Sequence, residues 1–213
     1  AVLRPLQVFT DNYPEDKTDV ISVDINPNKP ELGKKNVIFS REIYIEQDDF
    51  MLNPVGKYFR LCPEKEVRLK GAYYIKYASH EEDENGNITA VHCTYDPESF
   101  GGETPDGRKV KGTLHWVSAN HCKDAEIRLY ERLFNVPNPS DEEGVSSFAD
   151  NLNPSSLTVL ENCKIEADLA EAKTGDVFQF MRQGYFCVDP DSSDEKIVFN
   201  QTVALKDSFA KKG

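Results

Sequence analysis

The chain has 213 residues, with 37 acidic against 25 basic side chains and a net charge of −12 at neutral pH. This balance argues against a histone-like or polybasic nucleic-acid binder, whose affinity comes from bulk neutralisation of phosphates, although it leaves room for a local basic groove. With 38% hydrophobic residues, including 12 Phe and 9 Tyr, the chain can build a core.

No stretch of the sequence predicts a membrane crossing or a signal peptide, because no run approaches 18 apolar residues and no basic segment precedes an apolar one at the N-terminus. The five cysteines form no C-x-x-C pair, which indicates reduced thiols. His115, His121 and Cys122 lie close in sequence but lack a fourth ligand, so no metal site is predicted. We therefore expect a cytoplasmic protein without a membrane partner.

Short runs that alternate apolar and polar residues predict many strands. They are expected over residues 19–25, 36–45, 66–77, 88–95, 110–118, 126–133, 157–167, 177–188 and 197–205. A turn is expected at 83–87, where Asn85-Gly86 favours positive φ at both central positions. Short helices are expected near 48–53 and 145–151. The pattern predicts an all-β fold, and the number of strands favours two β-barrels over one.

The usual catalytic motifs are absent from the sequence. It has no G-x-G-x-x-G, no Walker A loop, no G-x-S-x-G elbow and no H-E-x-x-H. Acidic runs at 81–84 and 189–191 lie in predicted turns, where like charges are normally separated by water. A hydrolase with a carboxylate pair therefore has only the abundance of Asp and Glu in its favour.

Basic residues gather in one segment, 57–76, which has a local charge of +4. Arg68 and Lys70 have the same parity in the predicted strand, so both side chains are expected on one face. Such cations suit phosphates, and nearby aromatic rings suit the stacking of unpaired bases. The rings are those of Tyr58, Phe59 and Tyr73.

The string GRKVKGTLHWV at 107–117 resembles the C-terminal, anticodon-binding region of glutaminyl-tRNA synthetase. The resemblance continues through EIRLYERLF at 126–134 and VPNP at 136–139, and resumes at 178–187 and 198–207. Earlier in the chain, NKPELG at 28–33 and EVRL at 66–69 also fit the family. The resemblance therefore covers essentially the whole chain.

The resemblance implies two β-barrels, one inserted in the other, with a few short helices. Residues 1–16 and 113–213 would form the proximal barrel, and residues 17–112 the distal barrel. The family's catalytic domain, which uses ATP with Mg, precedes this region and is absent here. Ala1 in place of Met fits an excised fragment. The fragment alone is expected to have no catalytic site, no cofactor and no aminoacylation activity.

The implied function is recognition of the anticodon loop of glutamine tRNA, for ATP-dependent glutaminylation by the missing N-terminal domain. The implied partners are glutamine isoacceptors and that domain, and not DNA. The positions that resemble base-contacting residues of the family are Asn28, Arg60, Arg68, Gln179 and Arg182. Guanidinium and amide groups offer paired donors and acceptors to the edges of unstacked bases.

Three further candidate contacts are lysines that depart from the family's pattern. Lys70 and Lys206 stand where Arg is expected, and Lys57 and Phe59 stand where Gln and Lys are expected. An Arg-to-Lys change keeps the charge but loses the planar fork, which favours phosphate contacts at Lys70 and Lys206.

Two alternatives to the glutaminyl-tRNA synthetase hypothesis stay open. An archaeal or eukaryotic-type glutamyl-tRNA synthetase shares the same barrel region, and a protein-interaction barrel that lost RNA binding would suit the acidic surface. Trp116 is expected in the core because a large ring gains most by burial. Arg128 and Arg132 are expected to make structural ion pairs or to face the missing domain.

Overall fold

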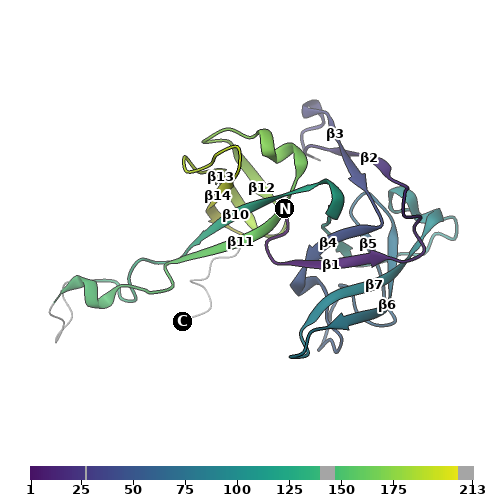
Figure 1. Ribbon diagram of the computed structural model, residues 1–213, viewed down its shortest axis with the longest axis horizontal. Helices are drawn as coiled ribbons and strands as arrows, with labels where there is room; N and C mark the ends of the chain where they lie inside the picture. The colour runs from purple at the N-terminus through teal and green to yellow at the C-terminus, as the bar shows by residue number, and fades with distance from the viewer. Residues whose placement is uncertain (27, 140–146, 206–213) are drawn as a thin grey trace. The chain divides into compact units, whose positions relative to one another are not determined.

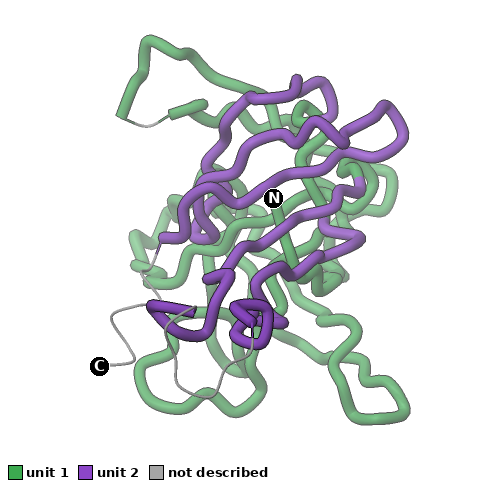
Figure 2. The backbone as a smooth tube through the Cα atoms, turned by 90° about the vertical axis from the view of Figure 1, so that its left-hand side faces the viewer, with its two compact units in different colours: residues 1–123, 164–169 green, residues 124–163, 170–213 purple. Residues whose placement is uncertain are grey.

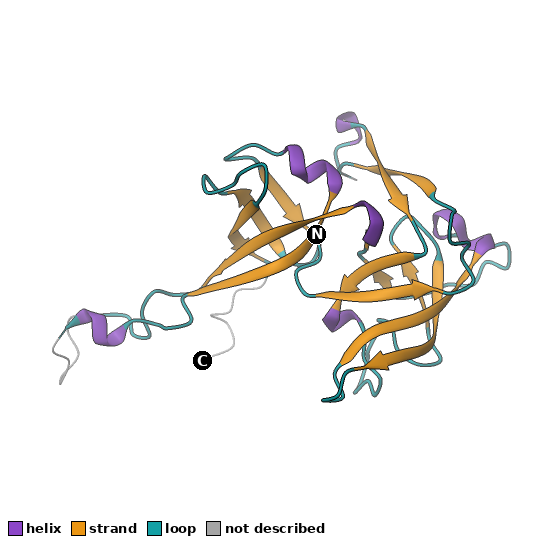
Figure 3. Cartoon of the chain, in the orientation of Figure 1, coloured by secondary structure: helices purple, strands orange, loops and turns teal. Residues whose placement is uncertain are grey.

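The computed structural model describes residues 1–26, 28–139 and 147–205, which form strands and short 3-10 helices (Figures 1 and 3). The chain divides into two compact units, unit 1 with residues 1–123 and 164–169, and unit 2 with residues 124–163 and 170–213 (Figure 2). The all-β prediction is confirmed. The expected barrel boundaries, 1–16 with 113–213 and 17–112, differ from these units and stay a prediction.

Unit 1 is built on a seven-stranded sheet with the order β8-β5-β6-β7-β1-β4-β9. Its strands are β1 (Pro5–Thr10), β4 (Glu42–Glu46), β5 (Glu66–Leu69), β6 (Tyr74–Glu82), β7 (Ile88–Asp96), β8 (Thr113–Leu114) and β9 (Val117–Ser118). β1 lies inside the sheet, parallel to β7 and antiparallel to β4. Its alternating burial puts Leu6 and Val8 into the core.

The two edges of this sheet are held by one short segment, residues 112–118. β8 pairs with β5 at one edge and β9 pairs with β4 at the other, and only two residues separate β8 from β9. Three trans peptide units span about 11 Å at most, so the two edges must come close together. The sheet therefore curls into a barrel-like form closed by this segment, which we call the seam.

Buried side chains explain why the seam is held in place. Trp116 is 6% exposed, as predicted for a core residue, and its Nε1 donates to the carbonyl of Lys70 at 3.1 Å. Leu114, two residues earlier in the chain, is fully buried. Gly112 lies so close to the carbonyl oxygen of Phe59 that an added Cβ would stand 2.4 Å from it.

A two-stranded ribbon, β2 (Asp19–Asp24) with β3 (Lys34–Phe39), completes unit 1. Ile21 and Phe39 bury their side chains in the same core as the large sheet. At the start of β2, Asp19 Oδ2 accepts the hydroxyls of Tyr13 at 2.8 Å and Tyr73 at 2.6 Å. One carboxylate thus ties the ribbon to two other parts of unit 1.

Four of the predicted strands are broken in the structure, and these predictions were wrong in extent. The strand expected over 36–45 is interrupted at Ser40 and Arg41, because β3 and β4 belong to different sheets. The strand expected over 110–118 corresponds to the seam, in which two residues separate β8 from β9. The strand expected over 177–188 is a hairpin with a turn at 181–183.

The fourth break changes a site prediction. The strand expected over 66–77 turns back after Leu69, and Gly71 adopts a φ of +72° in that turn. Lys70 therefore lies in the turn, outside β5, so the strand alternation that was expected to place it beside Arg68 ends before it. The prediction of two cations on one strand face was wrong.

The hairpin of β6 and β7 is confirmed, with a different turn from the one expected. Gly86 alone has positive φ, at +77°, and its N–H donates to the carbonyl of Asp83 at 3.0 Å. The carboxylate of Asp83 accepts from the backbone of Asn85 and Asn87. These bonds favour an ordinary turn followed by a left-handed glycine over a turn with two left-handed residues.

Most residues of a five-stranded sheet with the order β11-β10-β14-β13-β12 belong to unit 2, and only the first two residues of β10 and the last three of β11 belong to unit 1. Its strands are β10 (Cys122–Tyr130), β11 (Leu157–Glu166), β12 (Val177–Phe180), β13 (Gly184–Val188) and β14 (Ile197–Ala204). Phe180 stacks on Phe186 with centroids 4.4 Å apart, and Phe199 meets Phe180 edge-on. Arg128 pairs with acidic groups that include Glu126 at 2.8 Å, so its predicted structural role is confirmed.

The helices of the described residues are all short. They are η1 (Pro30–Leu32), η2 (Gln47–Asp49), η3 (Pro97–Gly102), η4 (Ala119–His121), η5 (Phe148–Asn151) and η6 (Ala167–Glu171). The expected helices near 48–53 and 145–151 correspond to η2 and η5, although 145 and 146 lie outside the described residues. None of these helices has the length or hydrophobicity to cross a bilayer.

Asp19→Asn is expected to destabilise the protein by about 1–3 kcal/mol, because charged hydrogen-bond acceptors contribute more than neutral ones. Burial favours a higher pKa for Asp19, but hydrogen bonds from Tyr73, Tyr13 and Lys17 outweigh it and lower the pKa. Its contribution is therefore complete above the ordinary pKa of about 4 and is lost as the pH falls through the lowered value. Urea denaturation of the wild-type chain and of Asp19→Asn, at neutral and at acidic pH, measures the difference in their free energies of unfolding.

Asp24→Asn is the matched control for this prediction. Asp24 lies on the same strand, and its carboxylate is 3.9 Å from Lys34 with both side chains well exposed. The control should change the free energy of unfolding by less than about 0.5 kcal/mol. Equal effects at the two positions would contradict the proposed role of Asp19.

Candidate nucleic-acid interface

A hollow of about 410 Å³ opens on unit 1 beside the seam. Its lining combines five cationic side chains, two acidic ones and two aromatic rings with two valines and a glycine. The lining residues are Tyr58, Phe59, Arg60, Glu64, Lys65, Glu66, Val67, Arg108, Lys109, Val110, Lys111 and Gly112. In a chain of net charge −12, this is a local excess of positive charge beside exposed aromatic surface.

Arg60, a predicted site residue, lies in this hollow and is held by a buried acid. Its Nη1 donates to Oδ1 of Asp49, whose side chain is 0% exposed, and is 3.5 Å from the carbonyl of Asp48. Among the described residues, both of these bonds use Nη1, which leaves Nε and Nη2 without a protein partner. The buried carboxylate thus fixes one end of the guanidinium and leaves its other donors available.

Two other cations of the hollow are already engaged. Arg108 makes a bidentate bridge to Glu66, with both N–O distances at 2.9 Å, and also pairs with Asp96 and Asp106. These acids raise the pKa of Arg108, Glu66 most of all. Lys65 donates to the carbonyl of Tyr58 at 3.1 Å. Arg108 therefore shapes the wall of the hollow and adds little free positive charge.

Lys109 and Lys111 are different, because both are exposed and neither has an acidic partner among the described residues. The Nζ of Lys111 lies 5.8 Å from the centroid of the Phe59 ring. The Phe59 side chain is nonetheless 52% exposed. Burial raises the pKa of Tyr58 to about 12, so its hydroxyl stays protonated and donates to the carbonyl of Asp48 at 3.2 Å.

Arg68 and Lys70 take part in the closure of the sheet. Arg68 donates from Nε and Nη2 to the Thr113 hydroxyl of β8, at 3.2 and 3.0 Å. The backbone N–H of Lys70 donates to the carbonyl of Leu114 at 2.9 Å. Burial lowers the pKa of the Lys70 amine, against the opposing effect of Glu166. Neither residue lines the hollow.

Asn28 and Lys57 are exposed residues of irregular segments in unit 1. Asn28 follows β2 in the loop before η1, and its backbone N–H donates to the side chain of Asn26 at 2.9 Å. Lys57 lies in the segment that leads to Arg60. Their contribution to a ligand site stays a prediction, and Lys206 lies outside the described residues.

In unit 2, Gln179 lies in β12 and Arg182 lies in the turn between β12 and β13. Gln179 is exposed and pairs across the hairpin with Tyr185, which is also exposed. Arg182 occupies the turn with a φ of +62°, one of three non-glycine residues with positive φ in the described part of the chain. Left-handed backbone at a non-glycine residue costs free energy and is often found at functional sites.

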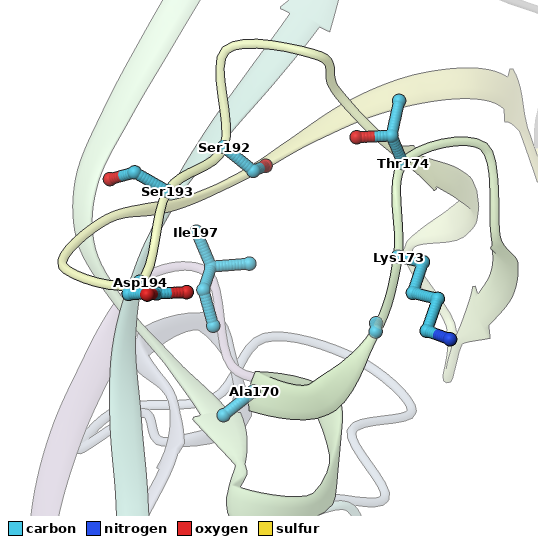
Figure 4. Close-up of a pocket in the computed structure, with 8 residues that line it drawn as sticks. Ala170, Lys173, Thr174, Ser192, Ser193, Asp194 and Ile197 are labelled. Carbon is cyan, nitrogen blue, oxygen red and sulfur yellow. The ribbon is translucent and has the colours of Figure 1, made fainter.

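A second hollow, of about 440 Å³, lies elsewhere in unit 2 and lacks convergent chemistry. Figure 4 shows small side chains around Ile197, with the amine of Lys173 directed away from Asp194. None of the eight predicted residues lines it. Within the described ranges, no group of three His, Cys, Asp or Glu side chains is placed to hold a metal ion.

The sequence reasoning missed Lys109 and Lys111 as candidate contacts. Both lie in the Gly107–Gly112 string, which was noted for its resemblance to a family and not for its charge. The signal was present, because three of the six residues in this string, Arg108, Lys109 and Lys111, are basic. Only the pairing of Arg108 with three acids, which sequence does not show, distinguishes them from their neighbour.

Comparisons with known proteins also indicate a nucleic-acid interface. Two family models, both described as the anti-codon binding domain of class I tRNA synthetases (E and Q), match residues 1–96 and 113–189. The chain is 49% identical over 99% of its length to a glutamine–tRNA ligase of Bradyrhizobium diazoefficiens, and 50% identical over 98% to one of Clostridium perfringens. It spans 37–38% of the length of these relatives.

Arg60→Ala is expected to cost about 3 kcal/mol of folding free energy, because the buried carboxylate of Asp49 loses its cation. Lys57→Ala removes an exposed lysine from the same segment and should change stability by less than about 0.5 kcal/mol. Urea denaturation of the two variants at neutral pH makes the comparison. Similar small effects at both positions would contradict the anchoring of Arg60 by Asp49.

At the turn of unit 2, Arg182→Gly should be more stable than Arg182→Ala by about 1 kcal/mol, since only glycine adopts left-handed φ without cost. The two variants remove the same side chain, so their difference isolates the backbone. At Lys123, an exposed residue of β10, the order should reverse, because alanine suits a strand better than glycine. Thermal or urea unfolding of the four variants checks both signs.

Proposed function

Because the chain belongs to the family of anticodon-binding domains of class I tRNA synthetases for glutamate and glutamine, we propose that it recognises the anticodon loop of glutamine tRNA as part of a glutamine–tRNA ligase. The observation that carries the choice of glutamine is the identity of 48–50% over essentially the whole chain to ligases of that name. The geometry offers exposed donors suited to reading single-stranded bases.

The physical basis is the placing of a few donors on rigid elements. Gln179 and Arg182 lie on a tight hairpin, and Arg60 is oriented by a buried acid. An amide and a guanidinium can each match two groups on a base edge, which supplies specificity that charge alone does not. The target is a loop, because only unstacked bases present these edges.

The acidic remainder of the chain supports discrimination. A net charge of −12 weakens the background attraction to any polyanion, so binding depends on the placed contacts. The catalytic activity belongs to the whole protein, which we propose uses ATP with Mg in a domain outside this chain. Aminoacylation by the longer protein, assayed with glutamine and with glutamate, distinguishes this proposal from a glutamyl-tRNA synthetase.

The test on this chain is binding of a labelled glutamine anticodon stem-loop, followed by fluorescence anisotropy. The affinity should fall as salt rises, and single changes in the anticodon should each weaken binding by about 1–3 kcal/mol. Arg182→Ala should cost a similar amount and should alter the preference among bases. Equal binding of every stem-loop would contradict specific readout.

Lys123→Ala is the control for this experiment. It removes one exposed positive charge outside the candidate site, so it should change the affinity by less than about twofold and leave the base preference intact. A uniform loss of affinity in Arg182→Ala, without a change in preference, would reassign Arg182 to a phosphate contact. No binding at low salt would favour the protein-interaction barrel.

A further inference from the structure

The turn between β6 and β7 carries the only Asn-Gly pair of the sequence, Asn85-Gly86. Both residues are exposed. Gly86 has no side chain to crowd its backbone nitrogen, and even an added Cβ would meet no atom within 4 Å beyond its chain neighbours. Water and the side-chain amide of Asn85 can therefore both reach the peptide bond between these two residues.

An asparagine in this setting has a reaction open to it that needs no enzyme. The backbone nitrogen of Gly86 attacks Cγ of Asn85, and a new C–N bond forms. The bond from Cγ to the side-chain nitrogen breaks, and that nitrogen leaves as ammonia with the proton of the Gly86 amide. One water molecule then opens either C–N bond of the resulting succinimide ring, which leaves aspartate or isoaspartate at position 85. Water is the only co-reactant, and no electrons are transferred to or from an oxidant or reductant.

The folded turn keeps the attacking nitrogen in a hydrogen bond of its own. The N–H of Gly86 donates to the carbonyl of Asp83 at 3.0 Å, which makes Asn85 the third residue of a four-residue turn. At that position of an ordinary turn ψ is about 0°, and the following nitrogen then points away from the side chain. Closure of the ring therefore requires rotation of the Asn85 backbone and loss of the Gly86 bond.

The side chain of Asp83 holds the turn in this conformation. Its Oδ1 accepts the N–H of Asn85 at 2.9 Å and that of Asn87 at 2.8 Å. Its Oδ2 accepts the side-chain amide of Asn87 at 2.9 Å. These bonds, the one from the Asn87 side chain most of all, lower the pKa of Asp83, so it accepts them as a carboxylate at neutral pH. Three successive backbone amides, 85 to 87, thus donate to one residue.

We infer that Asn85 is a site of spontaneous deamidation, and that Asp83 sets its rate by holding the Gly86 nitrogen away from Cγ of Asn85. The inference does not depend on the proposed function. The product has one more carboxylate, so the net charge changes from −12 to −13, beside the acidic run 81–84. Isoaspartate also adds a methylene to the main chain, at a turn whose ends are joined by the bond from the Asp83 N–H to the Asn87 carbonyl at 2.8 Å.

The first test follows Asn85 and Asn87 in the wild-type chain, native and in guanidinium chloride, during incubation at mildly alkaline pH. Peptide mapping by mass spectrometry measures the deamidated fraction at each position. Asn85 should react in both samples, and about fivefold faster in guanidinium, the factor expected for the loss of one hydrogen bond. Asn87, which precedes the branched Ile88, should stay unchanged over the same period. An unmodified Asn85 in guanidinium would overturn the site, and equal rates in the two samples would overturn its control by the turn.

The second test compares Asp83→Ala with Glu84→Ala in the native chain. Both variants remove one exposed carboxylate close to Asn85, but among the described residues it is Asp83 whose side chain accepts the amides of the turn. Asp83→Ala should raise the rate of deamidation at Asn85 by about fivefold, and Glu84→Ala should change it by less than about twofold. Equal rates in these two variants would overturn the role of Asp83.

Asp83→Asn is the conservative variant for this experiment. Its amide oxygen can still accept the backbone N–H of Asn85, so its rate should lie between those of the wild-type chain and Asp83→Ala. A rate at or above that of Asp83→Ala would contradict control by the hydrogen bonds. Circular dichroism of each variant checks that the chain is folded, so that a difference in rate reports the turn and not global unfolding.

Discussion

Closure of the seven-stranded sheet by residues 112–118 is the constraint on which unit 1 depends. This seam pairs with β5 at one edge and with β4 at the other, and it buries Leu114 and Trp116 between these pairings. Gly112 makes the closure feasible because the carbonyl of Phe59 occupies the space where a side chain would stand. The same contact places Phe59 and the cations before Gly112 around one hollow, so fold and candidate site share a segment.

The charged residues of unit 1 also serve both the fold and the candidate site. Buried or half-buried acids organise the structure: Asp19 joins three parts of unit 1, Asp49 orients Arg60, and Glu66 engages Arg108. These pairs leave Lys109 and Lys111 as exposed positive groups within a chain of net negative charge. A surface with few unpaired cations attracts polyanions less strongly than a polybasic surface does, because fewer counterions are released on binding.

The sequence predicted where the strands lie, but it did not predict where four of them are interrupted. Apolar and polar residues alternate through 66–77, yet the chain turns at Gly71. A period of two indicates which side chains are buried, but it does not show where the strand ends and the chain reverses its direction. Arg60 was identified from a resemblance, but its pairing with Asp49 depends on tertiary contacts. Arg182 was identified without its left-handed φ. Lys109 and Lys111 differ from Arg108 through the pairing of Arg108 with three acids, which is a set of tertiary contacts that the sequence does not show.

The position of the seam along the chain also bears on how the protein is made. A ribosome releases β1, the ribbon and the β5–β7 strands before residues 112–118 exist, and β1 pairs with β7 across about 80 intervening residues. Such non-local pairing is slow, because the entropy cost of closing the long loop comes before the two strands gain any contacts with each other. Until the seam emerges, both edges of the sheet present unpaired backbone groups. The nascent chain therefore passes through an open-edged stage that ends only when residues 112–118 have emerged.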